Sequence, residues 1–311
     1  MTTMSGTPSG AGTAAPRRSG WDTAARGFAG LALLVAILMP IVGITPNVVI
    51  FASIPLAAVL ACRRYGWRTA VTYSVVTFVV ANIFENLSIA TGFPFGHYYY
   101  PGTSPRIIDF PIQVAFAYCA LGMICWLTAV ALLDNADQRL ADRGDPSRRI
   151  NIVALPALAA ALMTMFDLGS DSSSSTIQQA WVWTEGGGVF GVPWTNYLGW
   201  WLVTYIFFQI FALVLARKQA TAAAEHRREP LALATGVYVL LSVATMVLFF
   251  TQGGTAVDQT GQTWNVADLY STLFSFNLFG PVVIAALAAV KLARNDIARV
   301  PARSTEAGTR S

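Results

Sequence analysis

The sequence predicts an all-α membrane protein, a polytopic helix bundle of about eight transmembrane helices with both termini in the cytoplasm. Three observations support this prediction. First, 55% of the 311 residues are hydrophobic, only 12% are charged, and the mean hydropathy is +0.53. About 25% of the residues in a typical soluble domain are charged. Second, the apolar residues form long runs. Third, the basic residues alternate between successive loops.

The apolar runs give the elements in order. A transmembrane helix needs roughly 20 mostly apolar residues, and eight segments meet or approach that length. They are 27–45, 47–62, 69–90, 110–133, 150–167, 196–216, 231–250 and 268–291. The connection at 168–195 is long and contains an aromatic segment. We expect one transmembrane domain over 21–293, between disordered polar tails at 1–20 and 294–311.

The basic residues indicate how the helices are oriented. Lysine and arginine prefer cytoplasmic loops. Of the 20 basic residues, all except Arg106 fall in the two tails or in every second loop. This pattern fits an even number of spans with both termini in the cytoplasm. The sequence therefore predicts a multi-pass protein of the cell membrane.

Acidic residues gather at the opposite, outer ends of the helices. They are Glu85, Asp109, Asp167, Asp171, Glu185, Asp258 and Asp268. Only Arg106 is there to pair with them. Low-dielectric surroundings without a positive partner favour the neutral form of a carboxylic acid. Ionisable groups inside a membrane are rare and usually functional, so these acids are the first candidates for a site.

The third span and the segment after it form the first constellation. Asn82, Glu85 and Asn86 lie at i, i+3 and i+4 and share one helical face. This spacing predicts an acid held by amides and facing a cavity, or else a set of interhelical hydrogen bonds. The segment TGFPFGHYYYP, residues 91–101, follows directly, and its glycines and proline predict a rigid turn. Tyr98 and its two tyrosine neighbours either line a site or form an interfacial belt.

The second constellation covers residues 165–200. Asp167 and Asp171 lie four apart and share a face if the helix continues past its apolar run. The serine tract that follows predicts a loop. Trp181 and Trp183 precede a glycine-rich stretch in this long connection, so they are candidates for lining a site.

Metal-dependent chemistry on a diphosphate is a minor alternative for the two aspartates. Paired carboxylates can hold Mg²⁺ together with substrate phosphates. Such sites usually also recruit arginine or lysine, and only Arg106 is present at this end. The three cysteines and two histidines form no zinc or disulfide pattern. We expect no metal, no cofactor and no nucleic-acid partner.

The last span carries a polar stripe. Asp268, Thr272 and Ser275 recur at i, i+4 and i+7. Packing between helices through small polar groups explains such a stripe. Asp268 is nevertheless a candidate for substrate binding, because it lies at the same outer end as the other acids.

Carboxylic acids, amides and aromatic rings in an apolar setting fit one reaction class, the addition of a proton to an isolated carbon–carbon double bond of a lipid. A neutral, desolvated acid donates the proton, and aromatic faces stabilise the resulting tertiary cation. A second carboxylate then activates water or removes a proton, since acid–base catalysis uses two acids in different ionisation states. This chemistry requires no external cofactor.

Three motifs carry a family resemblance. ENLSIATGFPFGHYYY, FDLGSD and WVWTEGGGVFGVPWTNYLGW occur in this order within residues 30–292. Together they resemble the integral-membrane carotenoid biosynthesis family, which includes the CruF-type and bisanhydrobacterioruberin hydratase-like carotenoid hydratases. The resemblance implies addition of water across the terminal double bond of an acyclic carotenoid end, which gives a tertiary alcohol. The matching positions include Glu85, Tyr98, Asp167, Asp171, Trp183, Asn196 and Trp200. The family tends to have proline after the second aspartate, whereas this chain has Ser172.

The resulting hypothesis gives each candidate a role. Asp167 or Glu85 donates the proton, and Asp171 positions or activates water. The rings of Tyr98, Trp181 and Trp183 stabilise the cation. Three polar residues complete the predicted substrate site: Asn86, Asn196 and Asp268. The expected partners are a lipophilic isoprenoid or carotenoid, water, the lipid bilayer and other enzymes of the carotenoid pathway.

Three alternatives remain open at this stage. A membrane-bound terpene cyclase would protonate the same alkene, or an epoxide, but trap the cation with another double bond. A proton-coupled transporter would also place acids in its spans, although no convincing internal repeat is visible. A carotenoid-binding scaffold would bind pigment and leave it chemically unchanged.

Overall fold

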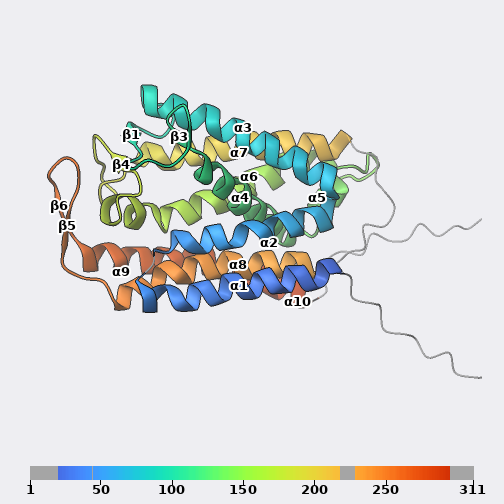
Figure 1. The fold of residues 1–311 in the computed structure, drawn as a ribbon. Coiled ribbons are helices and arrows are strands. Elements are labelled where there is room, and N and C mark those ends of the chain that lie inside the picture. Colours follow the sequence, from blue (N-terminus) through green and yellow to red (C-terminus); the bar gives the residue numbers. More distant parts are fainter. Residues whose placement is uncertain (1–19, 44, 218–227, 295–311) are drawn as a thin grey trace, which may run out of the picture.

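A computed structural model describes residues 20–43, 45–217 and 228–294 (Figure 1). The tails predicted to be disordered, 1–20 and 294–311, lie outside the described residues except for Gly20 and Arg294. Eight helical segments are long and apolar enough to cross a membrane, which confirms the predicted fold class. They are Gly20–Val42, Asn47–Tyr65, Trp67–Thr91, Ile112–Leu132, Arg148–Ile177, Trp194–Arg217, Arg228–Phe250 and Val266–Ala293.

Six of the eight spans are built on one helix each. The helices are α1 (Gly20–Val42), α2 (Asn47–Tyr65), α3 (Trp67–Thr91), α4 (Ile112–Leu132), α7 (Trp194–Arg217) and α8 (Arg228–Val247). A short 3₁₀ turn, η2 (Leu248–Phe250), extends α8. Two spans are interrupted. The fifth comprises α6 (Arg148–Leu168) and a π-helical turn, η1 (Ser173–Ile177). The last comprises α9 (Val266–Asn277), a second π-helical turn, η3 (Leu278–Val282), and α10 (Val283–Ala293).

The remaining elements are short and lie in the connections. Helix α5 (Ala136–Arg139) follows α4. Three antiparallel strand pairs join β1 (Tyr98–Tyr99) with β4 (Val182–Trp183), β2 (Arg106–Ile107) with β3 (Phe110–Pro111), and β5 (Thr255–Val257) with β6 (Thr263–Asn265). Of the strand pairs in the described residues, β1–β4 alone connects segments that are far apart in the sequence.

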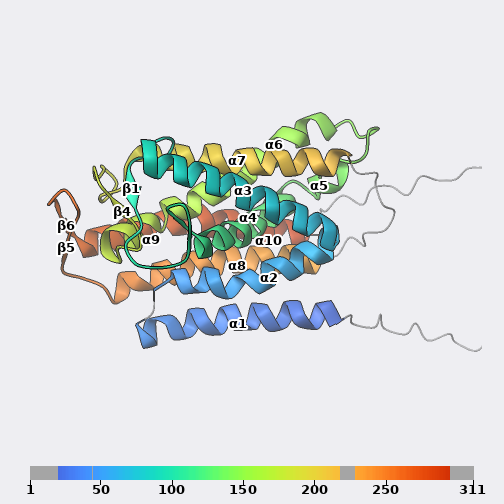
Figure 2. The same cartoon turned by 45° about the horizontal axis from the view of Figure 1, so that its top comes forward.

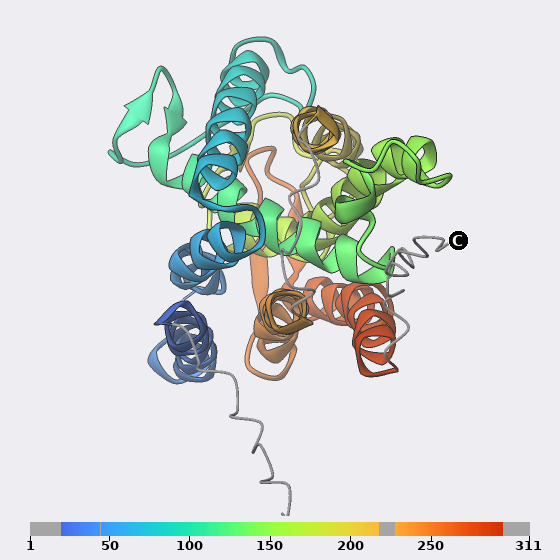
Figure 3. The ribbon, with the colours of Figure 1, turned by 90° about the vertical axis from the view of Figure 1, so that its right-hand side faces the viewer.

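Helix α4 lies in the middle of the bundle, and the other helices surround it (Figure 3). Its most apolar stretch is 78% buried, whereas the corresponding stretch of α1 is 17% buried. Helix α1 lies at the edge and packs on α2 and α8 (Figure 2). The polar side chains of α4 therefore face other helices, while the apolar side chains of α1 face lipid.

The bundle has two chemically different ends. The arginine end carries α5, the junction between α2 and α3, the start of α1 and the end of α10 (Figure 1). The pocket end carries all three strand pairs and the η1 turn (Figure 1). The described chain begins and ends at the arginine end, as an even number of spans requires.

Ion pairs fix the arginine end. Arg64 donates two hydrogen bonds of 2.8 Å to the carboxylate of Asp137, and both side chains are buried. Arg64 also donates to Asn135, and Tyr65 donates to Asp137. Trp126 of α4 completes the cluster by donating to the Tyr65 hydroxyl at 2.8 Å. This network ties α2, α4 and the α5 turn together.

Helix α1 begins seven residues before the apolar run that predicted it. Its first turn contains Asp22, which forms an ion pair with Arg63 of α2. Arg63 also pairs with Glu229 of α8 at 3.2 Å. An acidic residue in the first turn is also favourable to the helix dipole. Arg26 of α1 also pairs with Glu229 at 2.6 Å. Contacts with two distant helices thus extend α1 beyond its membrane-compatible sequence.

Close backbone packing positions the turn after α3. Gly92 ends α3 in the left-handed conformation, with φ of 80°. The hydroxyl of Ser88 then donates to the carbonyl of Gly96 at 2.9 Å and accepts from the amide of Phe95. A Cβ atom on Gly199 of α7 would lie 2.6 Å from the Phe95 ring, so only glycine allows this approach. The turn predicted from the glycines and proline is present, and it delivers the tyrosines of β1 to β4.

Candidate active site

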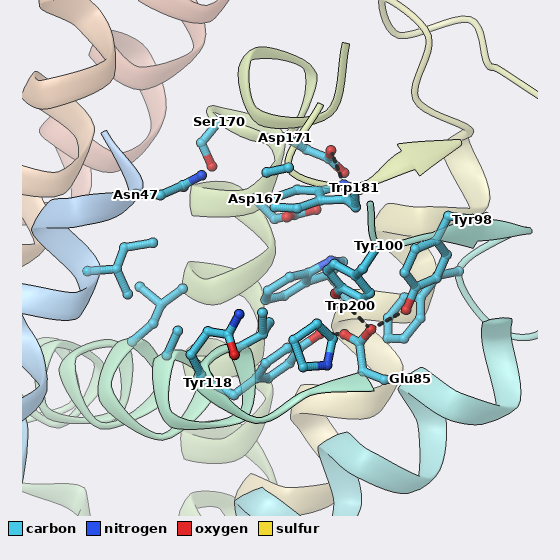
Figure 4. A pocket seen from close by; sticks show the side chains of 18 of the residues that line it. Asn47, Glu85, Tyr98, Tyr100, Tyr118, Asp167, Ser170, Asp171, Trp181 and Trp200 are labelled. Atoms are coloured by element: carbon cyan, nitrogen blue, oxygen red, sulfur yellow. Dashed lines mark hydrogen bonds between the residues drawn. The ribbon is translucent and has the colours of Figure 1, made fainter. Parts of the chain in front are cut away.

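A cavity of about 360 Å³ opens at the pocket end, between α2, α3, α4, α6 and α7 and under the β1–β4 pair (Figure 4). It brings together most of the side chains that the sequence singled out. Those among its lining are Glu85, Tyr98, Asp167, Asp171, Trp181, Trp183 and Asn196. Tyr100, Tyr118 and Trp200 also line it.

Glu85 is only 4% exposed, and three tyrosine hydroxyls surround its carboxyl group. The hydroxyls of Tyr98 and Tyr100 both donate to Oε2 of Glu85, and the bond from Tyr100 is 3.3 Å long. The hydroxyl of Tyr118 donates to Oε1 at 2.5 Å. Tyr98 pairs in register with Trp183, so the β1–β4 contact fixes its position. We call Tyr98, Tyr100 and Tyr118 the phenol cluster.

Burial disfavours the ionised form of Glu85, and the phenol cluster opposes this effect, because a carboxylate can only accept hydrogen bonds and here receives three. Burial, followed by the charge of Glu85, raises the pKa of Tyr98 and of Tyr100 well above the ordinary value. Both phenols therefore keep their protons and act as donors. Amides were the expected partners of Glu85, but Asn82 instead donates to the backbone carbonyl of Phe78 at 2.8 Å.

Asp167 and Asp171 form a second acidic centre, the aspartate pair. They are 3% and 1% exposed. The amide nitrogen of Asn196 donates to Asp167 at 2.8 Å and to Asp171 at 2.6 Å, so one group bridges both carboxyls. Trp181 donates to the other oxygen of Asp171 at 3.0 Å. Two buried carboxyls that meet at one amide nitrogen repel each other when both are charged, which favours a state in which the pair holds one proton.

The serine tract after Asp171 is not the loop that the sequence predicted. Ser172 to Ser175 are buried, and Ser173–Ile177 is the π-helical turn η1. The hydroxyl of Ser175 donates to the carbonyl of Asp171 at 3.0 Å, and Ser173 bonds to the hydroxyl of Tyr270 in α9 at 3.0 Å. Serine hydroxyls that bond locally to backbone carbonyls can be buried in a helix. The tract thus keeps Asp171 on the same face as Asp167.

Two residues that shape the site escaped the sequence reasoning, because their important contacts are with other helices. Tyr118 of α4 stacks on Trp200 with ring centroids 4.8 Å apart and an interplanar angle of 9°. Asn277, in the last span, donates to the carbonyl of Gly169 at 2.7 Å, between the two aspartates in sequence. A Cβ atom on Gly169 would lie 2.7 Å from the Asn277 side chain. The only signal in the sequence was polarity at a membrane depth.

Two predicted substrate-binding residues do not line the cavity. Asn86 accepts a hydrogen bond from the backbone amide of Asp109 at 2.9 Å and so anchors the β2–β3 turn. Asp268 is exposed in the first turn of α9. The hydroxyls of Thr272 and Ser275, which continue its stripe, donate to carbonyls of their own helix.

The β5–β6 hairpin packs beside the glycine-rich segment that precedes α7. Asp258 accepts from the Thr260 hydroxyl at 2.6 Å and from the Trp264 indole at 2.8 Å. Burial opposes ionisation of Asp258, but these hydrogen bonds outweigh it and lower its pKa. Trp264 packs edge-on against Phe190 at 5.5 Å. Asp258 therefore has a structural role in the hairpin and does not line the cavity.

The side chains that line the cavity suit an organic substrate better than a metal ion. Over residues 20–43, 45–217 and 228–294, no three His, Cys, Asp or Glu side chains are grouped as metal ligands would be. The amide of Asn196 already occupies the space between the aspartates. Nine aromatic rings make up much of the remaining lining: Phe51, Phe95, Tyr98, Tyr100, Tyr118, Phe166, Trp181, Trp183 and Trp200.

The fold and the cavity together define a class of protein. It is an integral-membrane helix bundle with buried acids and aromatic rings in a cavity at one end. Comparison with protein families then shows to which family the chain belongs. The model of the family described as carotenoid biosynthesis protein matches residues 45–258, and the chain belongs to this family. Every residue that lines the cavity lies within the matched range.

Searches among curated proteins and among solved structures gave no match. The family nevertheless confirms the resemblance that the three sequence motifs indicated. The protein therefore has a role in carotenoid biosynthesis, in a membrane, and a carotenoid-related molecule is a plausible substrate for its cavity.

Proposed function

We propose that the protein is a carotenoid hydratase of the cell membrane. It adds water across the terminal carbon–carbon double bond of an acyclic carotenoid end group and produces a tertiary alcohol. One observation carries the proposal: two buried acidic centres with different partners line a single aromatic cavity. Acid–base catalysis uses two such groups in different ionisation states.

The aspartate pair is the proton donor in this proposal. A proton shared by Asp167 and Asp171 moves to the less substituted carbon of the terminal alkene. An O–H bond breaks and a C–H bond forms, and the positive charge develops on the tertiary carbon. The pair then carries both negative charges, which the Asn196 amide and the Trp181 indole stabilise by donating hydrogen bonds.

Aromatic rings and Glu85 stabilise the cation. Tyr100 donates to Glu85 and lies 6.4 Å from the ring of Trp181, which in turn donates to Asp171. The two acidic centres are therefore joined by aromatic contacts, and Figure 4 shows Tyr100 and Trp200 between them. A desolvated cation over an aromatic face gains about 2 kcal/mol or more, and a nearby carboxylate adds attraction.

Water then captures the cation. The water oxygen bonds to the tertiary carbon, and the proton it loses passes to Glu85. Exchange of protons with water returns Glu85 to its anion and gives the aspartate pair its shared proton again. The sum is one alkene and one water converted to one alcohol, with no net change in the protein.

The decisive experiment is expression in a host that makes lycopene, followed by mass analysis of the pigments. We expect products heavier by one water, and water labelled with a heavy oxygen isotope should pass that isotope to the product. The Asp167→Asn variant, expressed at the same level, serves as the control and should leave lycopene unchanged.

The same measurement separates the alternatives. A terpene cyclase would give a product of unchanged mass and altered absorption. A transporter or a pigment-binding scaffold would give no new pigment. Any of these outcomes, with wild-type protein folded in the membrane, would overturn the hydratase proposal.

A further inference from the structure

The cavity has an apolar arm that the proposed reaction does not use. Ile50 and Phe51 of α2 and Val114, Ala117 and Leu121 of α4 line it. The three α4 residues lie at i, i+3 and i+7 and so share one face of that helix, and the two α2 residues are adjacent in sequence. None of them bears a titratable or hydrogen-bonding side chain. The arm is thus a hydrocarbon surface continuous with the acid site.

The arm leads to the surface of the bundle. Phe51 is 37% exposed although it lies in a membrane span. Helices α2 and α4 pack against each other, and Figure 4 shows the α2 side of the cavity, marked by Asn47, opposite Glu85 and Tyr98. The cavity therefore extends from the acids towards lipid, along the start of α2 and α4.

A polar rim borders the arm on the water side. Thr45 and Ser104 line the cavity there and are exposed. Arg106 also lines it, and donates to the carbonyls of Tyr100 and Gly102 at 2.7 and 2.6 Å. These bonds hold the 100–106 loop in place over the cavity. An apolar chain that leaves the cavity finds favourable surroundings between α2 and α4, and unfavourable ones at this rim.

The volume of the cavity limits how much substrate it can hold. A cavity of about 360 Å³ lies near the lower end of the range of roughly 300–1,000 Å³ that is typical of pockets for drug-sized ligands. A carotenoid is several times longer than such a ligand, and its conjugated chain is too stiff to fold back.

We propose that the cavity takes one end of a linear polyene end-on, while the rest of the chain passes between α2 and α4 into the bilayer. The two ends of a symmetrical carotenoid then react in separate binding events. A singly hydrated carotenoid is released as an intermediate and must rebind in the opposite direction. The binding mode rests on the shape and chemistry of the arm, and the intermediate rests in addition on the proposed hydratase function.

Binding can be tested separately from turnover when the wild-type arm and the arm variants are compared in the inactive Asp167→Asn background. Purified protein in nanodiscs is titrated with lycopene, and quenching of tryptophan fluorescence by the polyene reports binding, since Trp181, Trp183 and Trp200 line the cavity. Ala117→Phe and, separately, Val114→Phe fill the arm. The matched control is Ala58→Phe, which adds the same side chain at an exposed position of α2 outside the cavity.

We expect each arm variant to weaken lycopene binding at least tenfold and the control to stay within twofold of the wild type. Thermal unfolding of each variant verifies that it is folded. If Ala117→Phe fails to fold, Val114→Phe decides. Folded arm variants that bind lycopene as tightly as the wild type would overturn the binding mode.

The time course of pigment conversion tests the intermediate. With little enzyme, singly hydrated lycopene should accumulate before the doubly hydrated product. Simultaneous appearance of both hydroxyls, without a free intermediate, would contradict end-on binding. If lycopene binds as described and no variant or wild type hydrates it, the hydratase proposal fails while the binding mode stands.

Discussion

The two ends of the bundle both bury carboxyl groups, but they give them opposite partners. At the arginine end, Asp137 receives two hydrogen bonds from Arg64, and Asp22 is paired with Arg63. At the pocket end, the partners of Glu85 and of the aspartate pair are phenols, an amide and an indole. Within the described part of the chain, none of these three acids has an ion pair.

The difference separates structural from chemical use of a buried acid. An ion pair fixes both charges, because removing either one leaves the other buried and uncompensated. Neutral donors leave the carboxyl free to change its protonation state, since no opposite charge is lost when it does. The arginine end therefore holds helices together, and the pocket end supplies the kind of carboxyl groups that the proposed proton transfers require.

The largest expected effect is on catalysis at the pocket end. Asp167→Asn removes the shared proton, and loss of a general acid lowers turnover by roughly 10²–10⁴-fold. We expect hydration of lycopene in membranes to fall by this amount while folded protein stays at the wild-type level. Asp268→Asn, an exposed acid at the same end, is the control and should retain activity. Near-normal turnover in Asp167→Asn would contradict the assignment of a catalytic role to the acids of the pocket end.

A comparable substitution at the arginine end should affect stability instead. Asp137→Asn leaves Arg64 buried without its countercharge, which costs roughly 3–5 kcal/mol of unfolding free energy. Denaturant unfolding in detergent measures this loss, and turnover per folded molecule should be unchanged. The double variant Arg64→Met with Asp137→Leu should recover most of the stability. A fall in turnover without a fall in stability would assign this end a catalytic role.

A smaller effect is expected from one member of the phenol cluster. Tyr118→Phe keeps the ring stacked on Trp200 but removes a hydrogen bond to the Glu85 carboxylate. Such bonds contribute about 1.5–3 kcal/mol, or roughly ten- to hundredfold in rate. Steady-state hydration by purified enzyme measures it. The matched control is Tyr238→Phe, whose hydroxyl bonds to the Leu162 carbonyl, and neither residue lines the cavity. Equal losses in both variants would reduce the tyrosine to a packing role.

The smallest effect is expected at Asn277, which positions the turn between the aspartates. Asn277→Ala removes a neutral hydrogen bond to Gly169, worth about 0.5–1.5 kcal/mol, so hydration should fall roughly two- to tenfold. Because the spacing of the pair changes, the pH dependence of the rate should shift as well. Ser275→Ala, an exposed position on the same helix, should change neither. A rate loss with an unmoved pH profile would indicate loss of packing alone.

The spans could be predicted closely because a membrane restricts which sequences can cross it. Most predicted boundaries lie within about three residues of the observed ones. The start of α1 was missed because Arg63, 41 residues further along the chain, stabilises its polar first turn. The buried serine tract was missed because composition indicates a loop, whereas the hydroxyls form bonds inside the bundle.

The candidate site was only partly predictable. Glu85 and the aspartates stand out because acids are rare in apolar spans. Tyr118 and Asn277 do not, since their contacts come from other helices. Spacing along a helix also identifies a shared face without showing what that face meets, which is why Asn86 and Asp268 were singled out although neither lines the cavity.

The bridging amide of Asn196 has a mechanical consequence. Its nitrogen contacts one oxygen of each aspartate, so it keeps an acceptor whichever carboxyl holds the hydrogen. The pair can give up and recover that hydrogen with no rotation of a side chain and no shift of α7. In the proposed reaction the aspartate pair therefore resets without a conformational change, and movement of the long apolar carotenoid into and out of the cavity limits the rate.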